Sequence, residues 1–268
     1  MFIVMTSGFT TVTEIGGSGA TPEQLSMLYT RYHIAAELAA DKDVLEVACG
    51  PGIGLGYLAK RARRVVGGDC DPKLVNIARE RYGNVLEVCE LNAEQLPFED
   101  GTFDVVLMLE AIYYLPQPEA FVAEAHRVLR AGGTLFICSA NRESDGFNPS
   151  PFSHQYYSAE ELNLLLRQSG FTAGMFGGFP MPTYGARNRL LGFLKKVAVS
   201  LHLIPKTMRG KERIKRLLFG KLSSIPLELT EDFAEYRAPE ALDGQVAARG
   251  YKVIYAIGQK TRANASST

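Results

Sequence analysis

The sequence predicts an α/β fold in which helices cover both faces of a doubly wound, largely parallel sheet. Segments of strand length alternate with segments of helical periodicity from residue 21 to about residue 140. The strand-like segments are almost continuously apolar, which is typical of parallel strands buried on both faces. With 268 residues, 46% of them apolar, the chain can bury one core and also carry an insertion.

The first helix is expected to begin after Thr21, which can cap it. Pro22 suits the first helical position, and Gln24 completes a capping box. Apolar residues then recur at helical spacing to about Ala40. We take Tyr29 as a candidate cofactor-binding residue. Four side chains of this helix could reach a ligand: Tyr29, Arg31, Tyr32 and His33.

A strand over residues 44–47 carries Glu46 and breaks into a glycine turn at Gly50 and Gly52, after which a helix is expected over about residues 53–61. Glycine permits positive φ and lets the backbone approach a ligand closely. The first turn of the helix also offers free N–H groups. The turn therefore predicts a nucleotide-type binding corner, although a glycine turn alone does not choose the ligand.

Charge narrows the choice of ligand at this corner. A dinucleotide would bring its pyrophosphate to the turn, where Glu46 would repel it, and no GxGxxG pattern begins at Gly50 or Gly52. S-adenosylmethionine would bring an α-ammonium and a sulfonium, which a carboxylate attracts, while the amides of the turn could take its carboxylate. The corner therefore favours S-adenosylmethionine.

Two acids follow the second predicted strand, residues 64–69, and we expect them to have different roles. Asp71 precedes Pro72 at the start of the next helix and is expected to cap that helix. Asp69 ends the strand, nineteen residues after Gly50, where a carboxylate can accept both hydroxyls of a ribose. Asp69 is therefore the candidate for ligand binding.

Three more strands are expected at residues 84–91, 103–109 and 134–140, with a helix over residues 119–129. Because the carboxyl ends of parallel strands meet at one edge of a sheet, ligands bind there. The residues expected at this edge are Gly50, Asp69, Asn92, Glu110 and Asn141.

The second half of the chain departs from this alternation. A helix capped at Ser158 precedes a short strand at 170–176, and the last strand is expected at 250–259. Between residues 185 and 221, eleven Lys or Arg residues stand against one acid, so this segment carries +10 and the remainder −10. So long a connection indicates a folded insertion. The expected organisation is a mobile arm (1–20), a cofactor-binding domain (21–178), a basic helical cap insertion (179–236), the end of the domain (237–260) and a disordered tail (261–268).

Four segments together resemble the class I S-adenosylmethionine-dependent methyltransferases, in particular the group acting on small molecules. They are Val44–Ala59, Val65–Arg79, Asn92–Tyr114 and Glu119–Ala140. The family motif reads acid-x-Gly-x-Gly-x-Gly, and Ala48 stands here in place of its first glycine. The resemblance implies a Rossmann-like sheet of seven strands in the order 3-2-1-4-5-7-6, with the last strand antiparallel.

The resemblance also implies S-adenosyl-L-methionine as cofactor and S-adenosyl-L-homocysteine as product, with no metal. Asp69 would hold the ribose hydroxyls, and Asn92 with Ala93 would meet the adenine, although the family usually has Asp where Asn92 stands. The expected cofactor-binding residues are Tyr29, Glu46, Ala48, Gly50, Gly52, Asp69, Cys70, Asn92, Ala93, Glu94, Leu109 and Glu110.

Methyl transfer from a sulfonium is an in-line displacement, in which the protein aligns the reactants and excludes water. A general base helps when the nucleophile starts protonated, and the candidates are Glu110 and His154. The candidate substrate-binding residues are Tyr113, Tyr114, Asn141, Tyr156 and Tyr157.

We expect a small organic acceptor, methylated at oxygen or nitrogen, and the basic insertion favours an anionic one. The alternatives are a lipid, quinone or peptide acceptor at a membrane or carrier surface, an NAD-type oxidoreductase, and a cofactor-binding domain without catalysis. Nucleic acid is disfavoured because the rest of the chain is acidic. Four scattered cysteines and no apolar run of spanning length indicate a cytoplasmic protein, monomeric or homodimeric, in which peripheral membrane contact stays open.

Overall fold

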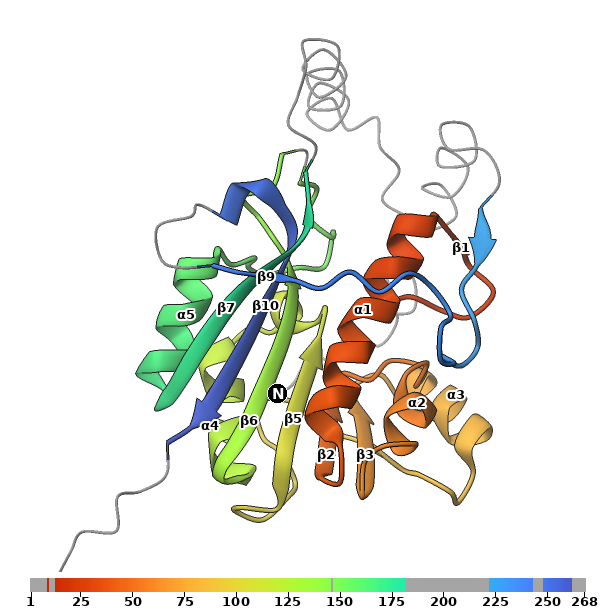
Figure 1. Cartoon of the computed structure of the whole chain (residues 1–268). Coiled ribbons are helices and arrows are strands. Elements are labelled where there is room, and N and C mark those ends of the chain that lie inside the picture. Colours follow the sequence, from red (N-terminus) through yellow and green to blue (C-terminus); the bar gives the residue numbers. More distant parts are fainter. Residues whose placement is uncertain (1–8, 10–12, 146, 182–221, 243–247, 262–268) are drawn as a thin grey trace, which may run out of the picture.

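The computed structural model describes residues 9, 13–145, 147–181, 222–242 and 248–261. Most of the basic insertion and of the tail lies outside these residues. The described elements, shown in Figure 1, are β1 (Gly19–Ala20), α1 (Pro22–Ala39), β2 (Asp43–Val47), α2 (Leu55–Ala59), β3 (Arg64–Asp69), α3 (Pro72–Tyr82), β4 (Glu87–Glu90), β5 (Phe103–Leu109), the 3-10 turn η2 (Ile112–Tyr114), α4 (Pro118–Val128), β6 (Leu129–Ala140), α5 (Ala159–Gln168), β7 (Phe171–Pro180), β8 (Ser223–Ser224), β9 (Glu240–Ala241), η3 (Ala248–Gly250) and β10 (Tyr251–Lys260).

The main sheet has the predicted strand order. Its described strands follow the order β4-β3-β2-β5-β6-β10-β7-β9. The five strands from β4 to β6 are parallel, and β10 runs antiparallel to both β6 and β7. This confirms the predicted order 3-2-1-4-5-7-6 with an antiparallel last strand, and the short β9 extends the β7 edge.

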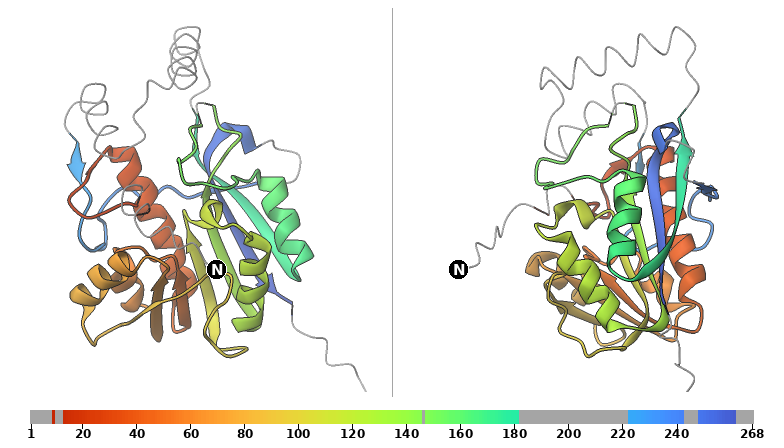
Figure 2. Two further views of the ribbon diagram at one scale, coloured as in Figure 1. Left: turned by 180° about the vertical axis from the view of Figure 1, so that it is seen from behind. Right: turned by 90° about the vertical axis from the view of Figure 1, so that its left-hand side faces the viewer.

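Helices cover both faces of this sheet, as the apolar strands predict. Apolar residues of α1, α2 and α3 share one buried cluster, while α4 and α5 contribute to a second cluster on the opposite face. The side view in Figure 2 shows the sheet between these two layers. The fold therefore buries most of β2, β5 and β6 and leaves their carboxyl ends at one edge.

Local sequence signals set several element ends. Thr21 caps α1 in a capping box with Gln24, and Ser158 does the same for α5 with Glu161. The strand expected at 170–176 continues as β7 to Pro180, through Gly177 and Gly178. A methyl group at Gly178 would lie 2.4 Å from the Tyr255 ring. The glycines therefore make room for rings on β10 instead of ending the strand.

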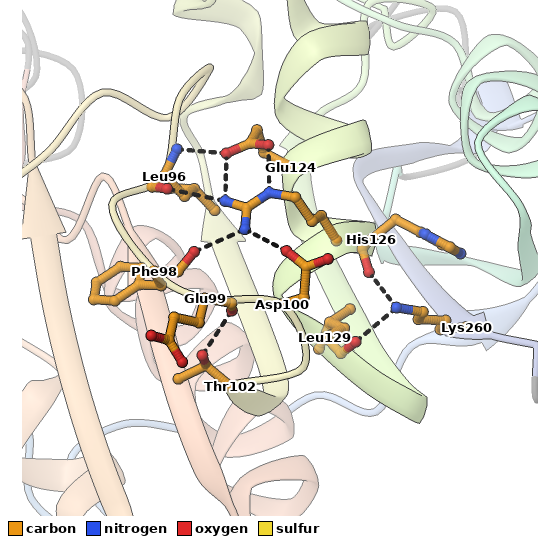
Figure 3. Close-up of polar contacts among 10 residues, drawn as sticks. Leu96, Phe98, Glu99, Asp100, Thr102, Glu124, His126, Leu129 and Lys260 are labelled. Carbon is orange, nitrogen blue, oxygen red and sulfur yellow. Dashed lines mark hydrogen bonds and ion pairs between the residues drawn. The ribbon is translucent and has the colours of Figure 1, made fainter.

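The loop between β4 and β5 is fixed by an arginine on α4. The Arg127 guanidinium donates to the carbonyl oxygens of Phe98 and Leu96, at 2.7 and 3.0 Å, and pairs with Glu124 and Asp100 (Figure 3). Glu124 also accepts from the Leu96 backbone N–H at 2.7 Å. These contacts hold the loop that carries the predicted adenine-binding residues.

Candidate active site

The turn after β2 has the left-handed backbone that its glycines suggest. Gly50 and Gly52 have φ of 57° and 76°. Ala48, which stands where the family motif has glycine, has φ of 59° although it carries a Cβ atom. An L-residue in this conformation costs about 1–2 kcal/mol. Ala48 is therefore a strained residue, and the turn keeps the tight conformation that glycine would allow.

Glu46 is buried beneath this turn with one carboxylate oxygen unpartnered. The Tyr32 hydroxyl donates to Oε1 at 2.6 Å, whereas Oε2 has no partner and the side chain is 1% exposed. Burial raises the pKa of Glu46 to about 7, against the effect of the Tyr32 hydrogen bond. A methyl group at Gly54 would fall 1.8 Å from the Tyr32 ring, so this glycine lets α1 close over the corner. A buried carboxylate with an open oxygen suits a cationic group.

Asp69 joins the end of β3 to the glycine turn. Its two carboxylate oxygens accept from the backbone N–H groups of Gly50 and Asp71, each at 2.9 Å. Burial raises the pKa of Asp69, and these hydrogen bonds oppose the rise. Each oxygen keeps a second acceptor position, so Asp69 can hold the turn and still accept ribose hydroxyls. Asp71 caps α3 by accepting from the Lys73 N–H at 2.9 Å, as predicted.

The segment after β4 presents the predicted adenine-binding residues near the same edge. Asn92 is exposed, and its side-chain oxygen accepts from the Glu94 N–H at 3.0 Å. The Glu94 carboxylate in turn accepts from the Gln117 backbone N–H at 2.6 Å. Ala93, which stands between Asn92 and Glu94 in the sequence, is buried. Cys70 is an exposed free thiol directly after Asp69.

Glu110 follows the buried Leu109 at the end of β5, with φ of 56°. Its carboxylate accepts from the Tyr113 hydroxyl at 3.0 Å and the Ala140 N–H at 3.2 Å, and the Cys138 thiol lies 3.5 Å away. Burial raises the pKa of Glu110, and the positive charge of Arg31 opposes the rise. The carboxylate is thus held at the boundary between β5 and β6.

Aromatic rings gather next to Glu110. Tyr113 stacks on Tyr156 with ring centroids 4.2 Å apart and contacts Tyr114 at 4.6 Å. Tyr114 also meets Phe9, from the N-terminal arm, at 5.4 Å. Three of the predicted substrate-binding residues therefore gather next to Glu110, and a residue of the arm joins them.

Of the remaining candidates, Tyr29, Asn141 and Tyr157 make their contacts elsewhere, whereas the His154 backbone N–H donates to the Tyr113 carbonyl oxygen at 2.8 Å. The Tyr29 hydroxyl accepts from the Asp232 N–H at 3.0 Å, beside the Tyr57 ring. Asn141 is fully buried and donates to the carbonyl oxygens of Ala248 and Tyr251, at 2.7 and 2.9 Å. Tyr157 packs in the apolar cluster of α4 and α5, and the His154 side chain is exposed.

The structure brings three more polar residues near Glu110: Glu14 and Tyr255, which sequence reasoning did not assign, and Arg31, which it named only as able to reach a ligand. Arg31 is 8% exposed and pairs with Glu14, which comes from the predicted arm. Tyr255 on β10 is 1% exposed and lies opposite Cys138 in the β6–β10 register. Glu14 and Tyr255 lie far from the glycine motif in sequence, and no spacing rule connects them to it.

Taken together, the fold and this edge define a nucleoside-binding α/β protein of the doubly wound class. Its acids occur in spatial order from β3 through β2 to β5, and the open oxygen of Glu46 and the left-handed turn fit a cofactor with a ribose and a cationic amino-acid end. Among the described residues, no group of His, Cys, Asp and Glu could hold a metal ion. No helix in the described ranges is long and apolar enough to cross a membrane.

Comparison with known proteins places the chain within a family. Residues 45–137 match the family model described as "Methyltransferase domain". The chain is 30% identical over 177 residues to a ubiquinone biosynthesis O-methyltransferase of Pseudomonas aeruginosa (strain UCBPP-PA14), covering 64% of this chain and 73% of that protein. The chain belongs to the S-adenosylmethionine-dependent methyltransferases, and the cofactor of this family is S-adenosylmethionine.

Two further proteins show the extent of the similarity. A protein of Mycolicibacterium smegmatis named "Probable S-adenosylmethionine-dependent methyltransferase" is 36% identical over 167 residues, which cover 59% of this chain and 64% of that protein. The match thus spans less than two thirds of that relative. The crystal structure of a SAM-dependent methyltransferase from Thermotoga maritima shares the fold, with a TM-score of 0.57, 20% identity, and coverage of 90% of this chain and 91% of the other.

Proposed function

We propose that the chain transfers the methyl group of S-adenosylmethionine to an oxygen or nitrogen atom of a small organic acceptor. The observation that best supports this is the order of carboxylates along one sheet edge. Asp69 lies at the end of β3, Glu46 in the neighbouring β2, and Glu110 beyond β5, next in the sheet. This order suits the ribose and the amino-acid end of one cofactor, followed by an acceptor.

In this proposal the residues of the chain bind the cofactor and align it with the acceptor. S-adenosylmethionine, when bound, supplies an electrophilic methyl group on its sulfonium. Asp69 would accept the ribose hydroxyls, Glu46 would face the α-ammonium, and Asn92 would meet the adenine. Alignment of nucleophile and methyl group, with exclusion of water, supplies most of the rate in such a displacement.

Glu110 is the residue that we propose as general base. Its pKa is raised by burial, which moves a carboxylate toward the range where it can take a proton near neutral pH. The Tyr113 hydroxyl and the Ala140 N–H hold the carboxylate in place. His154, the other candidate, has an exposed side chain. The Tyr113, Tyr114 and Tyr156 rings would line the acceptor site.

Oxygen is the favoured methyl acceptor, because the Pseudomonas relative is named an O-methyltransferase. The same name supports a second candidate, a quinone-type or lipid-type acceptor met at a membrane surface. The basic segment on which the notion of an anionic acceptor rests lies outside the described residues. The family assignment gives no support to an NAD-type oxidoreductase.

Two measurements test this proposal. Isothermal titration should show binding of S-adenosylmethionine and S-adenosylhomocysteine but not of NAD, and tight NAD binding alone would contradict it. Methyl-labelled S-adenosylmethionine should then yield a labelled product with one of a set of phenols, amines and carboxylic acids. Cofactor binding without turnover on any acceptor would favour a domain that lacks catalysis.

With an acceptor in hand, Glu110→Gln should lower kcat by about 100-fold, since general bases contribute roughly 100- to 10,000-fold. The affinity for S-adenosylhomocysteine should change little, because Gln keeps the shape of the side chain. His154→Ala is the matched control and should retain most of the activity. A larger kcat loss in His154→Ala than in Glu110→Gln would reassign the base.

A further inference from the structure

Two buried polar atoms near Glu110 have no hydrogen-bond partner and no role in the proposed mechanism. They are Nε of Arg31 and the hydroxyl of Tyr255, on side chains that are 8% and 1% exposed as residues. Buried polar atoms in folded proteins are nearly always hydrogen-bonded, so an unpartnered one needs an explanation. Both atoms are consistent with contacts reserved for a ligand.

Arg31 is already paired on one side. Its Nη2 group donates to a carboxylate oxygen of Glu14, which comes from the segment before β1. The Arg31 side chain is 9% exposed, but that of Glu14 is 37% exposed. A carboxylate that binds an arginine side-on takes Nε and Nη2 together. Glu14 satisfies only Nη2, so the guanidinium holds half of such a contact.

The surroundings place this guanidinium near the proposed reaction centre. Arg31 precedes Tyr32, whose hydroxyl binds Glu46, and its charge acts on the buried Glu110 carboxylate. Tyr255 lies opposite Cys138 in the β6–β10 register, and the Cys138 thiol contacts Glu110 at 3.5 Å. Burial, followed by the Cys138 and Glu110 groups, raises the pKa of Tyr255, so its hydroxyl stays protonated and can donate.

Charge decides which kind of ligand could use Arg31. Glu14, Glu46, Glu110 and Asp69 already give the region more acids than bases, so an added anion would be repelled. Exchange of one carboxylate for another leaves the net charge unchanged. Because the Glu14 side chain is partly exposed, it can release Arg31 to a ligand and take up water in return.

We propose that Arg31 is a carboxylate-binding site, that Glu14 of the same chain occupies it in place of a ligand, and that an incoming carboxylate displaces Glu14 and completes the side-on contact, with Tyr255 as an added donor. This inference rests on the proposed function. The carboxylate belongs either to the amino-acid end of the cofactor or to the acceptor. In both cases Glu14 competes with the ligand and lowers its affinity.

Isothermal titration with two nucleosides tests the site. S-adenosylhomocysteine carries the α-carboxylate, and 5′-methylthioadenosine is a thioether nucleoside without the amino-acid part. Glu14→Gln keeps the side-chain shape and removes the competing charge, so binding should tighten about two- to fivefold, as expected for a partly exposed pair. Arg31→Lys keeps the charge, loses Nε, and should weaken binding about tenfold. Glu23→Gln is the matched control: it breaks the ion pair of α1 with Lys252, whose acid is similarly exposed at 41%, and should change nothing.

The pattern of responses identifies the source of the carboxylate. If it is the cofactor's, S-adenosylhomocysteine responds to both variants and 5′-methylthioadenosine to neither. If it is the acceptor's, both nucleosides bind unchanged, and 4-hydroxybenzoate or octanoate titrated into protein saturated with S-adenosylhomocysteine responds instead. Tyr255→Phe should weaken the same ligand severalfold without lowering Tm, because its hydroxyl has no partner to lose.

Two outcomes would overturn the inference. If Glu14→Gln and Arg31→Lys are both folded, as judged by their Tm, and bind every one of these ligands with unchanged affinity, Arg31 is not a carboxylate site. If the unaltered protein binds neither nucleoside, the proposed function fails as well. If the nucleosides bind, and neither their binding nor that of the two acids changes in either variant, this inference alone is overturned.

Discussion

The two sides of the ligand-binding edge are built by different means. On the side of β2, β3 and β4, backbone groups fix Asp69, which accepts from two backbone N–H groups, and the Gly50–Gly52 turn is left-handed. On the side of β5, β6 and β10, contacts between side chains prevail: the Tyr113 hydroxyl donates to Glu110, and Arg31 of α1 pairs with Glu14 from the segment before β1.

This difference divides the edge into two halves: a rigid β2–β4 half, fixed by backbone groups, and a β5–β10 half, whose contacts depend on individual side chains. Backbone hydrogen bonds specify a position largely independently of the neighbouring side chains, so the β2–β4 half suits a ligand common to a family. Side-chain contacts change with single substitutions, so the β5–β10 half suits a ligand that differs between members. Variants in the two halves should therefore fail in different ways.

The largest effect on cofactor affinity should come from replacing Asp69, in the β2–β4 half. Asp69→Ala removes a carboxylate that can accept two ribose hydroxyls, and each hydrogen bond to a charged group is worth about 1.5–3 kcal/mol. The affinity for S-adenosylhomocysteine, measured by isothermal titration, should fall about 100-fold. Asp71→Ala is the control, because it removes the cap of α3 at a cost of about 1 kcal/mol and should leave the affinity nearly unchanged. Equal losses in the two variants would contradict the ribose role.

Glu46 should make cofactor affinity depend on pH. Its pKa of about 7 means that it is largely protonated at pH 6 and ionised at pH 8. Because a cationic ligand prefers the ionised form, the affinity for S-adenosylmethionine should rise about tenfold over this range relative to Glu46→Gln. Parallel pH profiles in the two proteins would contradict an ammonium contact at Glu46.

Glu46 should also make the stability of the folded chain depend on pH. Its folded pKa lies above the ordinary value of 4.5, so the folded chain binds the proton more tightly than the unfolded chain. The resulting stability is fully present below about pH 4.5 and is lost as the pH rises through 7. Glu46→Gln should therefore raise Tm at pH 8 more than at pH 5, as thermal unfolding at the two pH values will show.

The smallest effect concerns the strained residue of the turn. Ala48→Gly should raise the free energy of unfolding by about 1 kcal/mol, because glycine adopts positive φ without the Cβ penalty. For a chain of this size Tm should rise about 2 °C. Ala120→Gly, within α4, should lower stability by a similar amount. A lower Tm in Ala48→Gly would show that the methyl group packs better than the strain costs.

The fold could be predicted because its signals are local. The cap at Thr21, the apolar β5 and the glycine turn each depend on a few adjacent residues, and family resemblance supplied the strand order. Asp69 and Asp71 could be distinguished for the same reason, since only Asp71 precedes a proline in a helix start. The structure confirms the cap at Asp71, and the ribose role of Asp69 stays a prediction.

The acceptor side could not be predicted in this way. Asn141 was expected to face a substrate, and its amide instead holds the start of β10, more than a hundred residues away in sequence. Tyr29 and Tyr32 share the helix α1, and only the helix orientation decides that Tyr32 meets Glu46. Such contacts depend on tertiary packing, which the spacing of residues in one sequence does not determine.

The pairing of β7 with β10 has a consequence for how this chain can vary. Pro180 lies opposite Tyr251, and the Met181 N–H donates to the Gly250 carbonyl oxygen at 2.6 Å, so the end of β7 and the start of β10 meet at one point. The described part of the connection between them is itself bound to the fold, since β9 pairs with β7 and the Leu229 N–H donates to the Ile53 carbonyl oxygen at 3.0 Å. A chimaera that exchanges the whole connection between relatives would therefore also replace a contact beside the glycine turn, and it should keep that turn only where the new segment restores the contact.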